Sequence, residues 1–294
     1  MIPRAQGIYA MLYALFDADE RLDRAALRRQ VEICIAAGVQ GVAALGLATE
    51  VSKLSEAERL AVMDWAAEDV AGRLPLALTV FDGSVAGQLA QVRHAERAGA
   101  DWVILQPPPA AADGPELAGF FGRVADAAGL PVAIQNAPGF FGRGLSADEI
   151  CALAARHPNL RLLKAEGPAV EIAGLVERTG LPVFNGRGGL ELVDNLRVGC
   201  AGMILAPEAV DVAVHAWTAF RAGDEAGAEQ AYAAMLPAAA FAMQGVEHLV
   251  CYGKRIFGLR AGIAIHDRSP ARRPTAAGLA MAARFADRLG AYPG

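Results

Sequence analysis

A lysine at the end of an apolar stretch is the residue of this chain best suited to chemistry. Lys164 follows the leucine-rich run 160–163, and the chain has only two other lysines, Lys53 and Lys254, which stand in polar or helical contexts. A lysine amine is a nucleophile only when neutral, and apolar surroundings lower the pKa of a lysine towards neutrality. We therefore predict that Lys164 forms a Schiff base with a carbonyl substrate. A lysine that reaches from a strand end to water is the plainer alternative.

The segments that must position Lys164 predict a parallel β/α architecture. A turn of small residues, a short apolar strand and an amphipathic helix recur eight times, with strands expected at 7–14, 39–45, 76–80, 102–105, 130–135, 160–164, 182–185 and 202–205. Strands that are apolar on both faces are typical of a parallel sheet covered by helices. No GxGxxG follows the first strand, as an open dinucleotide-binding sheet would require. We predict an α/β fold, a (β/α)8 TIM barrel over residues 1–223 with a C-terminal helical region over 224–294.

Capping residues locate several helix starts. Ser55 with Glu58, and Ser146 with Glu149, have the Ser-x-x-Glu spacing of a capping box. Asp23 precedes a stretch with apolar residues at helical spacing and is expected to cap it.

Composition narrows the class of protein. The net charge is −5, with 54% hydrophobic and 20% charged residues, which indicates a sizeable core and argues against a nucleic-acid-binding surface. Cys34, Cys151, Cys200 and Cys251 form no CxxC pair, so buried free thiols are expected. Residues 1–7 lack a signal-peptide pattern, and no apolar run is long enough for a membrane span. We predict a cytoplasmic protein with neither nucleic acid nor membrane as partner.

Active sites of such barrels lie at the carboxyl ends of the strands. In this chain those ends are 46–50, 106–109, 135–139, 164–166, 186–189 and 206–208. Because side chains alternate along a strand, Glu166 should lie on the same side as Lys164 and could act as a general acid or base. A solvated loop carboxylate is the alternative. The histidines fall on predicted helices or in the C-terminal region, so no metal site is expected.

In order and spacing, these landmarks resemble the dihydrodipicolinate synthase and N-acetylneuraminate lyase family, lysine-dependent class I aldolases on a (β/α)8 barrel. The resemblance rests on segments 7–19, 46–58, 98–107, 135–138, 163–164 and 202–204. It implies that Lys164 is the Schiff-base lysine and that the substrate is pyruvate or another 2-keto acid, with an aldehyde as candidate second partner. It further implies no cofactor and a homo-oligomer, either a dimer or a tetramer.

The residues that move protons in typical members differ here. The position of the family's tyrosine on strand five holds Gln135, and the positions of its two threonines hold Leu47 and Ala48. The position of its interface tyrosine holds Pro108 or Pro109, and that of its carboxylate-binding arginine holds Phe140. Gln135 cannot exchange protons, although it can hydrogen-bond a carbonyl or carbinolamine oxygen. We therefore predict a Schiff-base lyase other than the lysine-biosynthesis synthase.

The predicted catalytic residues are Lys164, Gln135 and Glu166. Main-chain N–H groups around 47–49 are expected to hold the keto-acid carboxylate. Glu50, Glu166 and Arg187 are candidates to replace the lost acid/base and carboxylate-binding groups, and Phe140 suggests a less polar distal pocket. The predicted substrate-binding residues are Leu47, Ala48, Thr49, Glu50, Phe140, Gly186, Arg187 and Ile204. Two alternatives stay open: a 2-keto-3-deoxy sugar-acid dehydratase that uses the same lysine, and a non-catalytic keto-acid binder or regulator.

Overall fold

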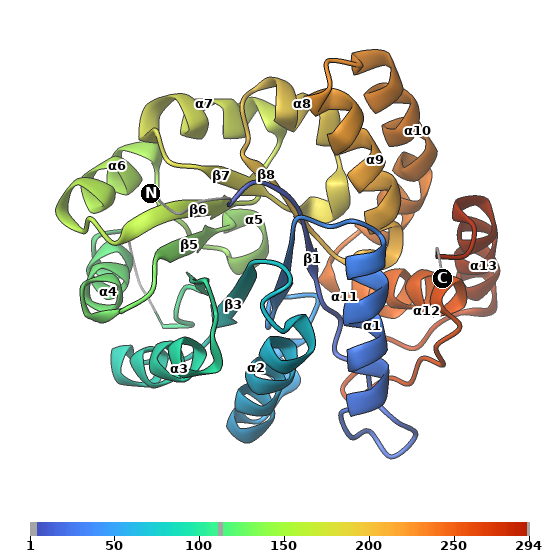
Figure 1. The fold of residues 1–294 in the computed structure, drawn as a ribbon. Helices are drawn as coiled ribbons and strands as arrows, with labels where there is room; N and C mark the ends of the chain where they lie inside the picture. Colours follow the sequence, from blue (N-terminus) through green and yellow to red (C-terminus); the bar gives the residue numbers. More distant parts are fainter. Residues whose placement is uncertain (1–4, 111–113, 293–294) are drawn as a thin grey trace.

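The centre of the protein is a closed barrel of eight parallel strands, which follow one another around the barrel in chain order (Figure 1). The computed structural model describes residues 5–110 and 114–292, so the outermost ends of the predicted regions 1–223 and 224–294 lie outside the described residues. The strands are β1 (Gly7–Met11), β2 (Gly41–Ala44), β3 (Leu76–Val80), β4 (Trp102–Leu105), β5 (Val132–Asn136), β6 (Leu160–Ala165), β7 (Val183–Asn185) and β8 (Gly202–Leu205). The predicted (β/α)8 TIM barrel is confirmed.

Helices surround the barrel, and the last of them gather on one side of it, against α9 and α1 (Figure 1). They are α1 (Arg24–Ala36), α2 (Glu56–Val70), α3 (Val85–Ala98), α4 (Gly114–Ala127), α5 (Pro138–Phe141), α6 (Ala147–Arg156), α7 (Ala169–Thr179), α8 (Leu192–Arg197), α9 (Val210–Arg221), α10 (Glu225–Ala242), α11 (Val246–His248), α12 (Lys254–Ala261) and α13 (Ala276–Leu289). Short turns are η1 (Val51–Lys53), η2 (Arg187–Gly189), η3 (Pro207–Ala209) and the π-helical η4 (Leu249–Gly253). Both predicted capping boxes and the Asp23 cap are present.

The first strand is shorter than predicted. It was expected to reach Ala14 but ends at Met11. The reason is that Gln30 of α1 bonds both main-chain groups of Tyr13: Tyr13 N–H donates to Gln30 Oε1 at 2.9 Å, and Gln30 Nε2 donates to Tyr13 O at 3.0 Å. A helix side chain thus replaces the neighbouring strand as hydrogen-bond partner.

Three aromatic rings from non-adjacent strands fill the barrel interior. Tyr9 of β1 lies edge-on to Trp102 of β4 and to Phe184 of β7, with ring centroids 5.8 and 5.3 Å apart. Tyr9 pairs in register with Gly41, where a Cβ atom would lie 2.2 Å from the Tyr9 ring. The small residue at the start of β2 is therefore what makes room for the ring.

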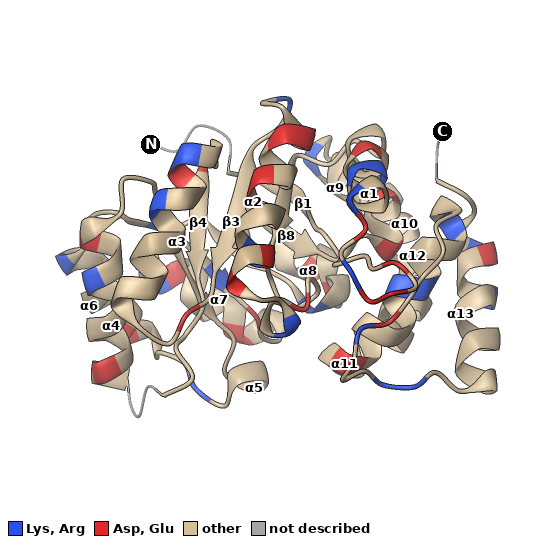
Figure 2. Ribbon diagram, turned by 90° about the horizontal axis from the view of Figure 1, so that it is seen from below, with Lys and Arg blue, Asp and Glu red and all other residues tan. Residues whose placement is uncertain are grey.

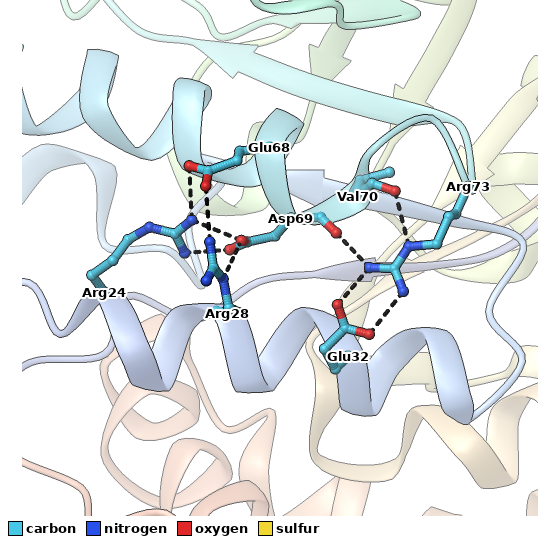
Figure 3. A network of polar contacts seen from close by, with 7 residues as sticks. All are labelled: Arg24, Arg28, Glu32, Glu68, Asp69, Val70 and Arg73. Atoms are coloured by element: carbon cyan, nitrogen blue, oxygen red, sulfur yellow. Dashed lines mark hydrogen bonds and ion pairs between the residues drawn. The ribbon is translucent and has the colours of Figure 1, made fainter.

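Most charged residues lie on the outer helices, away from these rings. Figure 2 shows acidic and basic residues interspersed over the outer helices, whereas β1, β3, β4 and β8 carry none. One such network joins α1 to α2 (Figure 3): Asp69 accepts from Arg24 Nη2 at 2.7 Å and from Arg28 Nε at 2.9 Å. Burial by itself raises the pKa of Asp69, but the two guanidinium groups outweigh it and lower that pKa.

The cysteines follow the prediction with one exception. All four are free, and Cys34, Cys200 and Cys251 are buried. Cys151 was expected to be buried too but is half-buried, because it lies where α6 meets the end of α7, with Sγ 3.2 Å from Arg178 O.

The C-terminal helices are tied to the barrel through a buried polar network. Tyr13 OH donates to Glu208 Oε2 at 2.6 Å, and Arg260 of α12 donates to Glu208 O at 2.8 Å and to Asp211 Oδ2 at 2.6 Å. Burial raises the pKa of Glu208, although Tyr13 and Arg260 oppose that effect.

Among the described residues no single helix is long and apolar enough to cross a membrane. The helix pair Glu225–Ala242 and Val246–Ala261 has the length and composition of a span when taken together, but it is bent by 105°.

Replacing Glu208 by glutamine is expected to change how stability depends on pH. Because the pKa of Glu208 is raised by folding, its favourable contribution is complete below its unfolded pKa, about 4.3, and is lost as pH rises through its folded pKa. The free energy of unfolding of Glu208→Gln, relative to the parent protein, should therefore increase from about pH 4 to about pH 8. Denaturant unfolding across this range measures the difference, with the exposed Glu177→Gln as control. A difference for Glu208→Gln that is constant with pH contradicts the prediction.

Candidate active site

Lys164, Glu166 and Gln135 meet in one hydrogen-bonded cluster at the carboxyl end of the barrel. Lys164 Nζ donates to Glu166 Oε1 at 2.6 Å, and Gln135 Nε2 donates to the same oxygen at 2.6 Å. The side chains of Lys164 and Glu166 are only 6% and 7% exposed. The amine and the carboxylate therefore form an ion pair that is almost shielded from solvent, which strengthens their interaction.

The strand register explains why these three side chains meet. Gln135 pairs with Lys164 across β5 and β6, and Glu166 N–H donates to Asn136 O at 2.9 Å, which extends the pairing beyond the end of β6. Side chains two residues apart on a strand lie on the same face. Lys164 and Glu166 consequently point the same way, with Gln135 beside them on the neighbouring strand.

A pocket forms around this cluster, with about 390 Å³ of empty space including that open to solvent. Most of the predicted substrate-binding residues line it together with the lysine and the glutamate: Leu47, Ala48, Phe140, Arg187 and Ile204. The N–H groups of Leu47 and Ala48 donate to none of the described residues, whereas Thr49 N–H is used by the turn, donating to Gly46 O at 3.0 Å. Two of the three predicted main-chain donors are thus available for an anion.

Thr49 and Glu50 lie away from the lysine pocket. Thr49 is buried and its hydroxyl donates to Leu12 O at 2.5 Å, which holds the turn against the end of β1. Glu50 accepts from Lys53 Nζ at 2.8 Å and also from Lys254. It lines a neighbouring pocket instead. Both side chains are therefore occupied by structural contacts.

Lys254 is a buried lysine whose environment the sequence did not reveal. It is fully buried at the start of α12, 204 residues from its partner Glu50. Burial lowers the pKa of Lys254, and the Glu50 carboxylate opposes that effect. The signal in the sequence is a lysine followed closely by the apolar residues Ile256 and Phe257. This pattern predicts an apolar helix face but not the surface against which the helix packs.

Arg187 lines the lysine pocket, whereas Gly186, predicted to bind substrate, is not among its lining residues and lies beside Glu166. A Cβ atom at Gly186 would lie 2.9 Å from Glu166 Oε2, so the glycine lets the carboxylate occupy its position. Arg187 Nη1 donates to Glu191 Oε2 at 3.0 Å and the residue lines the pocket. Arg143, close in sequence to Phe140, instead donates to Pro108 O at 2.9 Å.

Replacing Gly186 by alanine is expected to lower turnover about 10²-fold, because the methyl group pushes the Glu166 carboxylate away from Lys164. The fold should be retained, since the displaced atom ends a flexible side chain. Gly174→Ala on α7 is the matched control, because its Cβ would meet nothing within 4 Å. Steady-state kinetics on both variants measures the effect, and equal rates for the two would contradict it.

The C-terminal region supplies pocket residues that the sequence reasoning missed. Met243, Val246 and Leu249, which extend from the end of α10 to the start of η4, line the lysine pocket, as does Met11 of β1. The prediction considered strand ends only. The glycine at 245, which interrupts a long helical stretch, is the one signal of a segment that turns back over the barrel.

The fold and this arrangement define a class of protein, the (β/α)8 barrels with a buried lysine–carboxylate pair in a pocket at the strand ends. Residues 4–271 match the family described as the dihydrodipicolinate synthetase family. The chain belongs to this family, whose matched members carry the names of synthases, dehydratases and aldolases.

Three relatives illustrate that range. The 4-hydroxy-tetrahydrodipicolinate synthase of Xanthomonas axonopodis pv. citri (strain 306) is 35% identical over 174 residues, which span 58% of this chain and 57% of that protein. The L-2-keto-3-deoxyarabonate dehydratase of Azospirillum brasilense is 28% identical over 80% of this chain and 79% of its own length. A mitochondrial protein of Coccidioides immitis (strain RS), provisionally named a 4-hydroxy-2-oxoglutarate aldolase, is 30% identical over 70% of this chain and 69% of its own.

Solved structures agree on the fold. A protein from Pseudomonas aeruginosa, provisionally described as a dihydrodipicolinate synthetase, superposes with a TM-score of 0.90 at 26% identity and covers 97% of this chain and 99% of its own. YagE, a prophage protein of the same family from E. coli K12 solved in complex with pyruvate, has a TM-score of 0.88 at 24% identity, over 97% of this chain and 98% of its own.

Proposed function

We propose that this protein is a lyase in which Lys164 forms a Schiff base with pyruvate or another 2-keto acid. The observation that carries the proposal is the buried Lys164 amine, 2.6 Å from the Glu166 carboxylate, at the end of β6 in a barrel of this family. The pyruvate complex of a structural neighbour supports the choice of keto acid.

The geometry supports a stepwise role for each group. The Lys164 ammonium transfers a proton to Glu166, and the neutral amine attacks the keto carbon. Loss of water from the carbinolamine gives an iminium, which draws electrons from the adjacent bond. Loss of a proton from C3 then gives an enamine that adds to an aldehyde carbon, or the reverse sequence cleaves that C–C bond. Glu166 is the acceptor placed to take and return these protons.

Other groups hold the substrate in this proposal. The unengaged N–H groups of Leu47 and Ala48 bind the keto-acid carboxylate, and Arg187 lines the same pocket. Gln135 Oε1 is buried and has no hydrogen-bond partner within residues 5–110 and 114–292. The amide of Gln135 is therefore free on that side to bond a hydroxyl of the carbinolamine.

We propose that the reaction differs from that of 4-hydroxy-tetrahydrodipicolinate synthase. Position 135 holds an amide that cannot relay protons, and position 140 holds an apolar ring that lines the pocket where a carboxylate-binding group is expected. The proposal also places the protein in the cytoplasm as a homo-oligomer, a dimer or a tetramer. Light scattering on the purified protein tests the oligomeric state.

Reductive trapping tests the Schiff base. Borohydride added with pyruvate should attach one reduced pyruvate irreversibly to the chain, and peptide mass spectrometry should place it on Lys164. The modified lysine can be identified readily because the chain has only two others, Lys53 and Lys254. Absence of an adduct on Lys164, under conditions in which a known family member is trapped, would overturn the proposal.

A dehydratase acting on 2-keto-3-deoxy sugar acids is the second candidate. The Azospirillum brasilense dehydratase, matched over 79% of its length, favours it, and the same iminium would promote loss of a hydroxyl as water. Product analysis on 2-keto-3-deoxy acids separates the two: pyruvate release indicates an aldolase, and a dehydrated keto acid without pyruvate indicates a dehydratase. Thermal stabilisation by pyruvate without turnover of either kind would instead indicate a keto-acid binder.

A further inference from the structure

A second pocket adjoins the one that contains Lys164. Leu47, Phe140 and Val246 line both pockets, so the two share a wall. The second pocket has about 760 Å³ of empty space including that open to solvent, against about 390 Å³ for the first. The second pocket is therefore the larger of two adjacent spaces, next to the one that contains Lys164.

The walls of the second pocket are largely apolar and aromatic. Phe81, Phe140 and Phe141 line it together with aliphatic side chains. Phe81 follows β3 and is held by Gln91 of α3: Phe81 N–H donates to Gln91 Oε1 at 3.0 Å, and Gln91 Nε2 donates to Phe81 O at 2.9 Å. Phenylalanine rings favour contact with another ring or an apolar chain.

Gln106 is the exceptional polar group in this pocket. The residue is 1% exposed, and its amide nitrogen Nε2 has no hydrogen-bond partner among the described residues. Both main-chain groups of Gln106 are hydrogen-bonded: its N–H donates to Val80 O at 3.1 Å, and its carbonyl oxygen accepts from Gln88 Nε2 at 2.8 Å. A buried donor without a partner is costly and rare in native proteins. A ligand oxygen in the pocket would supply the partner.

Lys53 adds a charged donor to the same pocket. Lys53 has a side chain only 11% exposed, and within the described part of the chain its ammonium makes one hydrogen bond, to Glu50 at 2.8 Å. Glu50 also binds Lys254, so its carboxylate is occupied. Glu247 lines the pocket as well but is exposed at its rim. The pocket therefore offers a ligand oxygen two donors, the Gln106 amide and the Lys53 ammonium.

We propose that this second pocket is the distal substrate subsite, that it takes an aromatic aldehyde or the aromatic half of an aldol adduct, and that Gln106 donates to an oxygen substituent on the ring. The inference rests on the proposed function, because it assumes that a keto acid is bound at Lys164. It identifies the second substrate of that reaction and assigns Gln106 as a residue that determines specificity.

The reaction that the subsite serves balances without a further reactant. A C–C bond forms between C3 of pyruvate and the aldehyde carbon, and the proton lost from C3 is matched by one gained on the new hydroxyl. Water then hydrolyses the iminium and releases the hydroxy keto acid from Lys164. Cleavage of the same product is the reverse and gives pyruvate and the aldehyde.

The test measures kcat/KM with pyruvate and four aldehydes: benzaldehyde, 3-hydroxybenzaldehyde, 4-hydroxybenzaldehyde and glyceraldehyde. The parent protein should prefer at least one hydroxybenzaldehyde to benzaldehyde by about tenfold, the value of one hydrogen bond to a buried amide. Gln106→Leu should abolish that preference and leave benzaldehyde within about twofold of the parent. Phe81→Ala should lower kcat/KM for all three aromatic aldehydes, because it removes a wall that they share.

The same samples are also tested for trapping of pyruvate on Lys164 without an aldehyde. This measurement distinguishes failure of the proposed subsite from failure of the proposed Schiff-base chemistry. Failure of the parent protein to trap pyruvate overturns both. Intact trapping with turnover of glyceraldehyde but of no aromatic aldehyde overturns the subsite alone, as does a Gln106→Leu variant that loses all aromatic substrates equally. Gln106→Glu keeps the shape of the side chain but replaces the amide donor by a carboxylate acceptor. If Gln106→Leu does not trap pyruvate, Gln106→Glu is measured in its place and should likewise lose the preference for hydroxybenzaldehydes.

Discussion

Replacing Lys164 by methionine is expected to abolish the borohydride-trapped adduct and to reduce turnover by about 10⁴-fold or more. The methionine side chain has a similar length and no amine, so the chain keeps its packing and loses its nucleophile. Of the described residues, Gln135 is then the partner left to the Glu166 carboxylate, at 2.6 Å. We therefore expect a moderate loss of thermal stability alongside the loss of chemistry.

Lys254→Met is the matched control for that experiment. Lys254 is also a buried lysine bound to a glutamate, but it pairs with Glu50 outside the lysine pocket. This variant should lose stability, because it removes one of the two lysines that bind the Glu50 carboxylate and leaves Lys53, and it should still trap pyruvate on Lys164. Adduct formation that survives in Lys164→Met, or that is lost in Lys254→Met while the protein stays folded, would contradict the assignment of the nucleophile.

Replacing Glu166 by glutamine should lower kcat by about 10²- to 10⁴-fold, the range typical of removing a general acid or base. The amide keeps the shape of the side chain and cannot accept a proton from Lys164. Trapping with pyruvate should still place the adduct on Lys164, but more slowly. The effect is therefore expected in proton transfer, while the ability to form the covalent bond is retained.

The pH profile of kcat/KM distinguishes this role from a purely structural one. If Glu166 moves protons, one limb of the parent profile should disappear in Glu166→Gln, whereas a packing defect would scale the whole profile down. Glu171→Gln, an exposed glutamate on the following helix, serves as the control and should leave the profile unchanged. A Glu166→Gln variant that turns over at the rate of the parent protein would exclude Glu166 as the proton acceptor.

Much of the fold could be predicted because its signals are local. β3 and β4 begin and end where the apolar runs 76–80 and 102–105 do, and the capping boxes at Ser55 and Ser146 form as their spacing indicates. Such signals depend only on neighbours in the chain. Where a distant side chain intervenes, as Gln30 does at Tyr13, the local signal gives the wrong boundary.

The candidate site also has one part that the sequence could predict and another that it could not. The contact between Lys164 and Glu166 follows from the two-residue repeat of a strand, so the sequence was sufficient to predict it. Gln135 could be assigned to the neighbouring strand, but its bond to Glu166 depends on the register of β5 against β6. Thr49 was expected to bind substrate through its main-chain N–H and Glu50 through its side chain, and only the packed structure shows that a turn and two lysines engage these groups.

By itself the sequence determined the barrel, the strand that carries Lys164, and the carboxylate beside the amine, because apolar periodicity and strand alternation are encoded within a few residues. Tertiary structure alone decided what surrounds them. The segment between α10 and η4 returns over the pocket, Lys254 docks on Glu50 across 204 residues, and Gln106 is left buried without a partner for its amide nitrogen among the described residues. Those contacts depend on how helices pack around the closed sheet, and no local pattern specifies that packing.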